Sequence, residues 1–453
     1  MDGGPAPETA AATALEIRGG TPLAGATVVD GSKNAALPLL AAAACLEQQV
    51  ELWGVPACTD VEAMLRLLRR LGWTVFLHWD LSQVTVSTVH PRSLQPDLAE
   101  AAAIRASYYL VAPLIAAYGR ARLPWPGGCS VGDRGMELHF AVYEAFGDHV
   151  DSGTRGYIVR AGGHGPHGSS TVQITLPFRS RGATVAALLR AVVAARPVVI
   201  GNANLSAELH ALYRALSVAG YEVEVGTQQV SLWPGRCSGR TSWRVPGDKI
   251  EAGTLACAIA ATGGRGHVDG ILAGDVAPLV EALALLGVPA TYTSTVRSDG
   301  DDAVNGDGRL TLEGPALPTG GSLRALASLA PGGLDADWEP GLMALALGLP
   351  GEHAFADAIN PGRHGNLIPQ LRKLGALVTE TSPTECWLTG PQSLTGAPVE
   401  ASDIRTGSAL LIAALAATGT TVLTGLSQLR RGHADLPGKL AALGAQLQIK
   451  RQV

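Results

Sequence analysis

The chain has 453 residues, of which 47% are hydrophobic and only 16% are charged, and its formal net charge at pH 7 is −5. This composition indicates a folded protein with enough apolar surface for two or three domains, and excludes a disordered chain. The mild negative charge and the lack of a long basic run argue against binding to nucleic acid or to an anionic membrane.

The chain begins with a segment, residues 1–14, that is rich in small residues and carries Pro, Gly and acidic side chains. It lacks the basic start and apolar core of a signal peptide, so we expect a disordered tail. No apolar stretch reaches the ~18 residues that a membrane span requires. The six cysteines show no C-x-x-C pairing, which favours free thiols over a zinc site or a disulfide framework. These features predict a cytoplasmic protein without a bound metal.

One pattern recurs six times along the chain: a helix that ends at a turn glycine and is followed by a strand. The intervals between these glycines are 67 to 88 residues, longer than the roughly 20–50 residues of common solenoid repeats, so closed domains are favoured over an open array. Glycine suits the position after a helix, where φ is positive. The pattern predicts turns at Gly72, Gly147, Gly220, Gly287, Gly375 and Gly444.

A second type of helix precedes each of these and is apolar on nearly all sides, which predicts that it is buried. Short β-branched runs link the two types, so that the chain is predicted to be an α/β protein of six units, three in each of two domains. The polar residues lie at the starts of the buried helices, whose free N–H groups and dipoles favour anions. The predicted buried helices are 32–45, 105–119, 182–195, 251–264, 339–351 and 406–419.

Four motifs carry a resemblance to a known family. They are LPWPGGCSVGDRGMEL at 123–138, GSKNAAL at 31–37, SDIRTGSALL at 402–411 and LRRGH at 429–433. The chain resembles the enolpyruvyl transferases, and within them the UDP-N-acetylglucosamine enzyme (MurA), from about Leu15 to its C-terminus. The resemblance implies an α/β fold known as an inside-out α/β barrel, with six βαβαββ-type units and a chain that crosses twice between the domains. One domain would be 33–246, with the Cys129 loop, and the other 247–453 joined to 1–32.

The resemblance also implies the groups that act on phosphoenolpyruvate. Cys129, on its Gly-Gly loop, would add to this substrate or protonate it; a neighbouring arginine and bound phosphate would lower the pKa of such a thiol. Arginine binds phosphate and carboxylate through two parallel hydrogen bonds, which suits a trianionic substrate. The predicted phosphoenolpyruvate-binding residues are Lys33, Arg134, Arg405 and Arg431, of which Lys33 and Arg431 are also assigned to catalysis. Arg430 is interpreted as a surface residue.

The family's general base is an aspartate that accepts the proton of the acceptor hydroxyl. Asp337 matches it best, and Asp335 is a competing assignment because the flanking residues differ from those of the family. Asp248, Lys249 and Asp403 are assigned structural or hinge roles; VPGDKIEAGT at 245–254 resembles another hinge motif, in which Asp248 and Lys249 would position the domain crossing. No organic cofactor, metal or protein partner is implied.

The acceptor implied by the resemblance is a uridine nucleotide. R-G-M-E-L at 134–138 resembles the segment that holds uracil, and SRGAT at 180–184 the segment whose backbone N–H groups hold the nucleotide phosphates. The predicted acceptor-binding residues are Asn34, Arg105, Arg134, Glu137, Leu138, Gly182, Asp337 and Arg363.

Three stretches depart from the family pattern: Leu205–Glu208, Asn360–Arg363, in which Arg363 itself is retained, and the segment before Asp337. In the family these stretches surround the amino sugar and the domain interface, whereas the phosphoenolpyruvate and uracil motifs are retained here. We therefore predict the same chemistry on uridine monophosphate, at the ribose 3′-hydroxyl, as in nucleoside-antibiotic pathways of the nikkomycin and polyoxin type. The alternatives are UDP-N-acetylglucosamine as acceptor, a shikimate-type transferase, and a non-catalytic nucleotide-binding relative.

Overall fold

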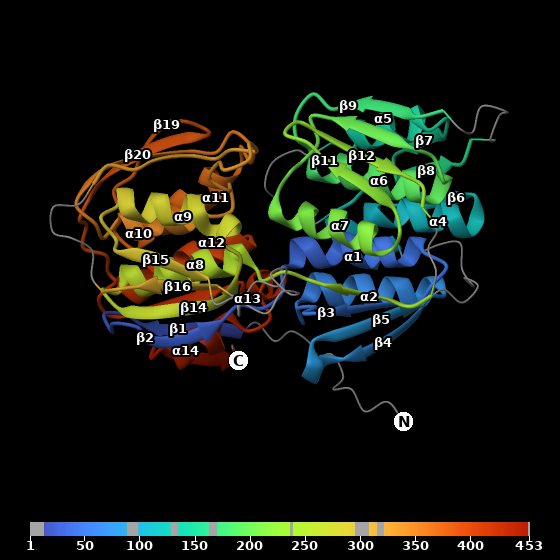
Figure 1. Cartoon of the computed structure of the whole chain (residues 1–453). Coiled ribbons are helices and arrows are strands. Elements are labelled where there is room, and N and C mark those ends of the chain that lie inside the picture. Colours follow the sequence, from blue (N-terminus) through green and yellow to red (C-terminus); the bar gives the residue numbers. More distant parts are fainter. Residues whose placement is uncertain are drawn as a thin grey trace.

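The computed structural model describes residues 13–87, 98–127, 135–162, 170–235, 239–294, 308–314 and 321–451. These residues form two lobes that lie side by side, each with helices inside and small sheets around them (Figure 1). The first lobe comprises the elements from residue 33 to residue 244, and the second comprises residues 13–28 together with 249–451.

The first lobe contains seven α-helices among its described residues, with bounds α1 (Lys33–Cys45), α2 (Thr59–Leu71), α3 (Leu98–Ala103), α4 (Val111–Tyr118), α5 (Glu137–Ala145), α6 (Arg181–Ala194) and α7 (Ala207–Val218). Two 3₁₀ turns are η1 (Trp79–Leu81) and η2 (Arg105–Leu110). Its strands are β3 (Val50–Trp53), β4 (Thr74–His78), β5 (Gln83–Ser87), β6 (Arg120–Leu123), β7 (His149–Gly153), β8 (Gly156–Arg160), β9 (Val172–Thr175), β10 (Val198–Gly201), β11 (Glu222–Val225), β12 (Gln229–Trp233) and β13 (Thr241–Arg244).

The second lobe has the helices α8 (Lys249–Ala261), α9 (Ala273–Leu285), α10 (Glu339–Ala346), α11 (Arg363–Lys373), α12 (Ile404–Ala416), α13 (Leu426–Arg430) and α14 (Leu436–Ala442). Its strands are β1 (Thr13–Arg18), β2 (Ala24–Val28), β14 (Arg265–Ile271), β15 (Ala290–Ser294), β16 (Gly308–Leu312), β17 (Arg324–Leu326), β18 (Gly351–Ala356), β19 (Thr379–Ser382), β20 (Glu385–Gly390), β21 (Pro398–Glu400), β22 (Thr420–Thr424) and β23 (Gln446–Arg451). No helix in the described parts of either lobe is long and apolar enough to cross a membrane.

The described strands form six small sheets of three or four strands, which agrees with a fold built from repeated units. The first lobe has the strand orders β13-β3-β5-β4, β6-β8-β7 and β11-β12-β10-β9, and the second has β15-β16-β14-β2, β17-β18-β20-β19 and β21-β22-β1-β23. Most sheets are mixed: β10, for example, runs parallel to β9 and antiparallel to β12. Strands β1 and β2 pair with β22, β23 and β14, so the N-terminal segment completes two sheets of the second lobe.

The turn glycines behave as the sequence predicts. All six adopt positive φ, between 74° at Gly287 and 105° at Gly72. At the end of α2, the N–H of Gly72 donates to the carbonyl of Arg69, and β4 starts two residues later. A side chain would strain this left-handed conformation, so glycine both ends the outer helix and allows the strand to begin. The predicted repeat of helix, glycine and strand is confirmed.

The apolar helices lie inside the lobes, again as predicted. In the first lobe α1 packs against α4 and α6, and in the second lobe α8, α10 and α12 pack against one another. One prediction was wrong: the continuous helix expected over 105–119 is the 3₁₀ turn η2 followed by the short α4. Pro113 has no N–H to donate to the carbonyl four residues earlier, and its ring clashes with that carbonyl, so a regular α-helix begins only at Val111.

Each lobe has its own hydrophobic core. One cluster of buried residues spans Ala35–Val245, and the other combines Leu15–Val29 with Ile250–Ala445. The chain passes between them in two short segments that run side by side. Ser32 N donates to Pro246 O at 2.7 Å, and Asp248 N donates to Asp30 O at 2.8 Å.

A buried carboxylate stabilises this crossing. Glu251 Oε2 accepts from Asp30 N and from Lys439 Nζ, each at 2.7 Å, while His433 Nδ1 lies 3.7 Å from Oε1. Burial alone would raise the pKa of Glu251, but the neighbouring His433 ring, together with the charge and the hydrogen bond of Lys439, outweighs it. The pKa therefore falls from 4.5 to about 2.

This network predicts an acid-sensitive contribution to stability. A carboxyl whose folded pKa is depressed stabilises the fold above its unfolded pKa, near 4.5, and loses that contribution as the pH falls towards 2. The shift corresponds to about 3 kcal/mol. In urea unfolding, Glu251→Gln should be less stable than the wild-type chain at pH 7, and the gap should narrow at pH 3. A gap that is the same at both pH values would contradict this assignment.

Candidate active site

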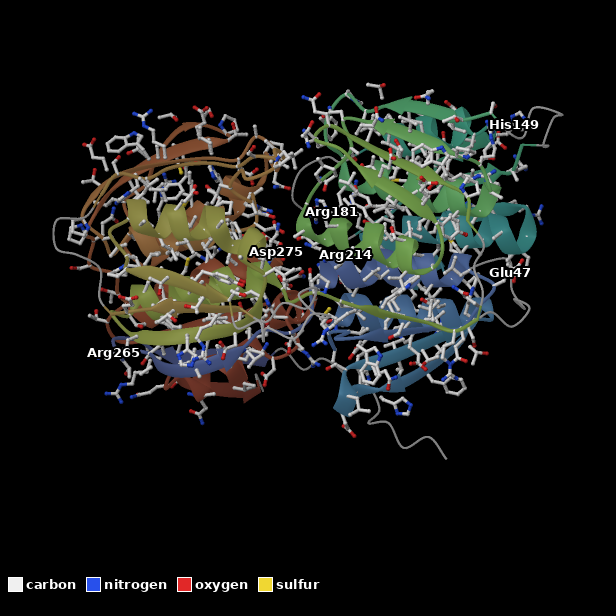
Figure 2. The ribbon with its side chains drawn as sticks, in the orientation of Figure 1. Glu47, His149, Arg181, Arg214, Arg265 and Asp275 are labelled. Carbon is white, nitrogen blue, oxygen red and sulfur yellow. The ribbon has the colours of Figure 1, made fainter. Side chains whose placement is uncertain are left out.

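A cleft of about 920 Å³ lies between the two lobes. Its walls include the first turns of α1, α6 and α8, and the segments 328–338 and 359–360 of the second lobe. Figure 2 shows Arg181 and Asp275, both cleft residues, at the place where the lobes face each other. Because helix N-termini present unpaired N–H groups and the positive ends of helix dipoles, this cleft favours anions.

Two of the predicted phosphoenolpyruvate residues meet at a carboxylate. Lys33 Nζ, from the first lobe, lies 3.3 Å from Asp60 Oδ2, and Arg431 Nε, from the second lobe, lies 3.0 Å from Asp60 Oδ1. All three residues line the cleft. At the same place Thr59 Oγ1 donates to Arg430 O at 2.7 Å and joins the lobes. Asp60 is thus paired with two cations from opposite lobes. The cluster of Lys33, Asp60 and Arg431 therefore has a net positive charge, and it lies at the cleft.

Asp337 is held by two buried arginines. Arg363 Nη2 lies 2.8 Å from Asp337 Oδ1, and Arg405 Nη2 lies 3.2 Å from Oδ2. Burial raises the pKa of this carboxyl, but the charges of Arg405, Arg363 and Arg181 outweigh it and hold the pKa well below its usual range. Asp337 is therefore ionised and able to accept a proton, although its basicity stays low while the arginines face it.

Asp335, the competing assignment for the base, has a different set of contacts. Its Oδ2 lies 2.9 Å from Lys249 Nζ, and its Oδ1 accepts from Asp337 N at 2.9 Å. Lys249 Nζ also lies 3.6 Å from Oε2 of Glu208, in α7 of the other lobe. Lys249, predicted as a hinge residue, therefore lies in the cleft wall and links the lobes. Asp335 is engaged in that link.

The other two predicted supporting residues cap helices. Asp248 Oδ1 accepts from Ile250 N at 2.8 Å, at the start of α8. Asp403 Oδ1 accepts from Arg405 N at 2.9 Å and from Thr406 N at 3.0 Å, at the start of α12. Each cap satisfies N–H groups that a helix leaves without a partner, and so fixes the first turns that carry Lys249 and Arg405.

The predicted acceptor residues of the first lobe line one side of the cleft. They are Asn34, Arg105, Glu137, Leu138 and Gly182. The first turns of α5 and α6 meet here, because a Cβ placed on Gly182 would lie 2.4 Å from His139 Nε2 and 2.7 Å from the Tyr108 hydroxyl. His139 is only 5% exposed, and both of its ring nitrogens lack a hydrogen-bond partner among the described residues. Burial, with the charge of Arg105, lowers its pKa to about 4, so the ring is neutral at pH 7.

This close approach makes Gly182 sensitive to substitution. In Gly182→Ala the new methyl group must displace His139 or Tyr108, and overpacking of this kind costs about 1–3 kcal/mol. We expect a lower melting temperature and weaker acceptor binding. Gly365, in α11, is the matched control, because a Cβ there meets nothing within 4 Å. Equal melting temperatures for Gly182→Ala and Gly365→Ala would contradict the contact.

Two predicted residues, Cys129 and Arg134, lie outside the described residues. Gly135, the first described residue after them, lines the cleft. Their predicted roles stay predictions.

Arg363, predicted to contact the acceptor, lies buried next to Asp337. Its side chain is 3% exposed, and it contacts Asp337, Asp357 at 3.1 Å and the carbonyl of Ala336. It is not among the residues that line the cleft. Arg363 therefore pairs with Asp337 in the same way as Arg405, which also lies outside the lining of the cleft. The predicted contact of Arg363 with the acceptor stays a prediction.

Sequence reasoning missed four residues of the cleft and its wall: Asp60, His139, Arg181 and Glu208. An acidic residue in the first turn of a helix, such as Asp60 or Glu208, is an ordinary helix-start feature. Their partners lie far along the chain: 371 residues separate Asp60 from Arg431. The one available signal was Arg181, a cation at a helix start, where the dipole disfavours it.

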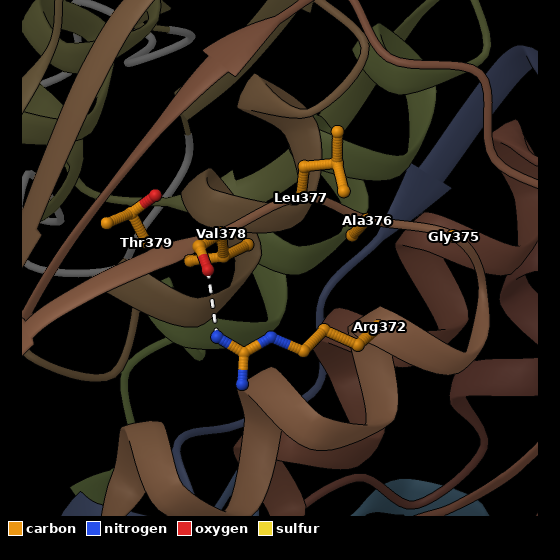
Figure 3. A pocket seen from close by; sticks show the side chains of 6 residues that line it. All are labelled: Arg372, Gly375, Ala376, Leu377, Val378 and Thr379. Atoms are coloured by element: carbon orange, nitrogen blue, oxygen red, sulfur yellow. Dashed lines mark hydrogen bonds between the residues drawn. The ribbon is translucent and has the colours of Figure 1, made fainter.

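A second hollow, of about 390 Å³, lies on the surface of the second lobe after α11 (Figure 3). Its cation, Arg372, donates to Val378 O at 2.9 Å and pairs with Glu380 at 2.8 Å. Arg372 is the one charged residue among the six that line this hollow, and its charge is already paired, so the hollow offers no group of side chains for catalysis. Within the described ranges, no group of three or more His, Cys, Asp or Glu side chains could hold a metal.

Comparisons with known proteins agree on one family. The family model for EPSP synthase (3-phosphoshikimate 1-carboxyvinyltransferase) matches residues 17–306 and 363–440. The chain is 32% identical over 436 residues to UDP-N-acetylglucosamine 1-carboxyvinyltransferase of Coprothermobacter proteolyticus, covering 96% of this chain and 97% of that protein. It is 34% identical over 449 residues to UDP-N-acetylglucosamine 1-carboxyvinyltransferase 3 of Symbiobacterium thermophilum, covering 97% and 99%.

Two solved structures share the fold. The enolpyruvyl transferase NikO from Streptomyces tendae superposes with a TM-score of 0.83 at 22% identity, covering 98% of this chain and 100% of that one. EPSP synthase from Acinetobacter baumannii has a TM-score of 0.74 at 18% identity, covering 97% and 100%.

Proposed function

Because this chain belongs to the enolpyruvyl transferase (EPSP synthase) family, we propose that it transfers the enolpyruvyl group of phosphoenolpyruvate to the ribose 3′-hydroxyl of uridine monophosphate and releases phosphate. Enolpyruvyl transfer is the activity of the family, and the acceptor is the part that is proposed. Residues 33–246 form one domain and residues 247–453 with 1–32 form the other, and the two close over the substrates.

The donor site rests on the cations that meet at the cleft. Lys33 and Arg431, paired through Asp60, bind the phosphate of phosphoenolpyruvate, and Arg405 with Arg134 binds its remaining anionic groups. Fixed cations that face the oxygen of a leaving phosphate stabilise the charge that develops there. Phosphoenolpyruvate is a trianion and attracts Arg405 away from Asp337. With one cation fewer beside it, Asp337 has a higher pKa and becomes a better base.

The reaction is an addition followed by an elimination. Asp337 accepts the proton of the acceptor hydroxyl while that oxygen forms a bond to C2 of phosphoenolpyruvate, and Cys129 donates a proton to C3. The resulting Cys129 thiolate then takes a proton back from C3, the C2–C3 double bond re-forms, the bond from C2 to the phosphate oxygen breaks, and phosphate departs. Closure of the domains keeps water from the intermediate.

The acceptor proposal rests on the departures from the family pattern at 205–208 and 360–363. Leu205 and Asn360 both line the cleft, yet Leu205 offers no side-chain hydrogen bond, and the Asn360 amide donates to Asp357 at 3.1 Å. These two positions therefore offer little to an amino sugar, whereas the uracil-type residues Glu137 and Leu138 are retained. The names of the curated relatives favour a second candidate, UDP-N-acetylglucosamine.

The test is phosphate release from phosphoenolpyruvate with a panel of acceptors: uridine monophosphate, UDP-N-acetylglucosamine and shikimate 3-phosphate. We expect release with uridine monophosphate. Release only with UDP-N-acetylglucosamine would refute the acceptor, and release only with shikimate 3-phosphate would place the chain with the shikimate-type enzymes. No release with any acceptor would favour a non-catalytic relative.

The assignment of Cys129 can be tested by alkylation. The Cys129 loop resembles that of the UDP-N-acetylglucosamine enzyme, whose loop cysteine fosfomycin alkylates. Intact-mass analysis after fosfomycin treatment should therefore show a single adduct that Cys129→Ser abolishes. The buried thiols Cys58 and Cys257 are poor competitors, because burial raises the pKa of each to about 12. An adduct on another cysteine would contradict the assignment.

A further inference from the structure

Asp357 is a buried carboxylate that holds the segment in front of α11. It directly follows β18, it is 1% exposed, and its own N–H donates to Thr384 O at 3.0 Å. Its Oδ1 accepts from Ile359 N at 3.1 Å and from Asn360 N at 2.9 Å. Its Oδ2 accepts from Asn360 Nδ2 at 3.1 Å and lies 3.1 Å from Arg363 Nη1. Both oxygens of this carboxylate are therefore engaged within the protein.

Arg363 connects Asp357 to the predicted base. The guanidinium of Arg363 lies between two carboxylates, with Nη2 2.8 Å from Asp337 Oδ1 and Nη1 3.1 Å from Asp357 Oδ2. The same Nη1 donates to Ala336 O, next to the base. Because a guanidinium is planar and its donors have fixed directions, contacts on both sides leave it one orientation. Asp357 thus fixes the direction from which Arg363 meets Asp337.

The charges of this group balance. Asp337 and Asp357 are negative, whereas Arg363 and Arg405 are positive, and Arg405 Nη2 lies 3.2 Å from Asp337 Oδ2. The side chains of Arg363 and Asp357 are 3% and 1% exposed, so their charges are screened little by solvent. Without the negative charge of Asp357, the charge of Arg363 would act on Asp337 alone and make it a weaker base.

The other groups near Arg363 do not replace Asp357. Glu339 acts on Arg363 through its charge, but its Oε1 lies 2.8 Å from His364 Nε2. Asp357 itself is not among the residues that line the cleft, although Ile359, which it holds, is one of them. Any effect of Asp357 on the reaction must therefore pass through the residues that it holds.

We propose that Asp357 is a positioning residue for the transfer reaction: it orients Arg363 against Asp337 and offsets the charge of that arginine, so that Asp337 stays in place and can still accept the proton of the acceptor hydroxyl. The inference rests on the proposed function, in which Asp337 is the base. It does not depend on the identity of the acceptor, because the base acts on the hydroxyl of whichever acceptor is bound.

The variant Asp357→Asn keeps the shape of the side chain and removes its charge. Its single oxygen can accept from Ile359 N and Asn360 N, but its NH₂ group then faces the donors of Arg363. We expect kcat to fall by about 10- to 150-fold, the range expected for the loss of a hydrogen bond to a charged group, while KM for phosphoenolpyruvate and for the acceptor changes less than about threefold. A raised KM with an unchanged kcat would overturn the proposal.

A double-mutant cycle with Arg363→Gln tests whether Asp357 acts through Arg363. Arg363→Gln alone should lower kcat, and adding Asp357→Asn should lower it by no more than about twofold further. Losses that multiply in the double variant, or an unchanged kcat in Arg363→Gln, would overturn the proposal. Because the double variant leaves neither charge of the pair without its partner, its comparison with Arg363→Gln still decides the matter if Asp357→Asn does not fold.

Asp148→Asn is the matched control, because it breaks another buried ion pair. The two oxygens of Asp148 lie 2.6 and 2.7 Å from the guanidinium nitrogens of Arg190, and neither residue lines the cleft. This variant should melt at a lower temperature than the wild-type chain but keep kcat within about twofold. An equal loss of kcat in Asp148→Asn and Asp357→Asn would overturn the proposal, because the loss would then follow from any broken buried pair.

The cycle is run with whichever acceptor supports turnover, so that this proposal and the proposed function can fail separately. Turnover with UDP-N-acetylglucosamine alone would refute uridine monophosphate as acceptor and leave the cycle as a test of Asp357. Turnover with uridine monophosphate and losses that multiply would refute the role of Asp357 alone. No turnover with any acceptor would refute both.

Discussion

Replacing Asp337 by asparagine is expected to lower kcat by roughly 10²- to 10⁴-fold, the usual contribution of a positioned general base. Asparagine keeps the shape of the side chain and can accept from one of the two arginines through its single oxygen, but it cannot take up the hydroxyl proton. The affinity for the acceptor should change much less than kcat, because the loss concerns the transition state. Steady-state kinetics with uridine monophosphate and phosphoenolpyruvate measure both.

Asp335→Asn is the matched control, two residues away. Asp335 is paired with Lys249 at 2.9 Å and holds the backbone N–H of Asp337, so its loss should disturb positioning and cost roughly tenfold or less. If Asp337→Asn kept the wild-type kcat while Asp335→Asn lost most of it, Asp335 and not Asp337 would be the base.

Arg431→Ala is expected to lower kcat/KM for phosphoenolpyruvate by roughly 10²- to 10³-fold, as found when one preorganised donor to a developing charge is removed. The guanidinium is one of two cations on Asp60, and it comes from the opposite lobe to Lys33. Its removal leaves Asp60 paired with Lys33 alone, so the net positive charge that attracts the phosphate disappears. Steady-state kinetics with varied phosphoenolpyruvate measure the loss.

The neighbouring Arg430 provides the comparison. Its side chain is exposed, and the contact it makes across the lobes, from Thr59 Oγ1, is to its backbone carbonyl. Arg430→Ala should therefore stay within about twofold of the wild-type rate, as expected for a surface position away from the site. If Arg430→Ala and Arg431→Ala lowered kcat/KM for phosphoenolpyruvate equally, the overall positive charge at the end of α13, and not the pairing with Asp60, would attract phosphoenolpyruvate.

The architecture could be predicted because each of its signals is local. A glycine at the end of an outer helix, such as Gly72 or Gly375, indicates a positive φ at that position, and only the few residues around it are needed to recognise the turn. The apolar helices α8 and α12 show their burial in their own composition. The 3₁₀ turn before α4 was the exception, since its cause is the single residue Pro113.

The site was predictable only in part, for a physical reason. Residues at the starts of buried helices, such as Lys33 and Gly182, could be singled out because a helix start has free N–H groups and the positive end of the dipole, which favour anions. The partners that give those residues their function come from distant segments: Asp60 for Arg431, Glu208 for Lys249, and Gly182 for His139. No periodicity links such positions, so only the folded arrangement shows that Asp60 pairs with two cations and that Arg363 pairs with Asp337.

The most direct test of this account is a competition in which the enzyme receives phosphoenolpyruvate with equal concentrations of uridine monophosphate and UDP-N-acetylglucosamine. Mass spectrometry of the nucleotides then shows which one gains an enolpyruvyl group. The account predicts the gain on uridine monophosphate, with phosphate released in equal amount. A gain confined to UDP-N-acetylglucosamine would contradict it.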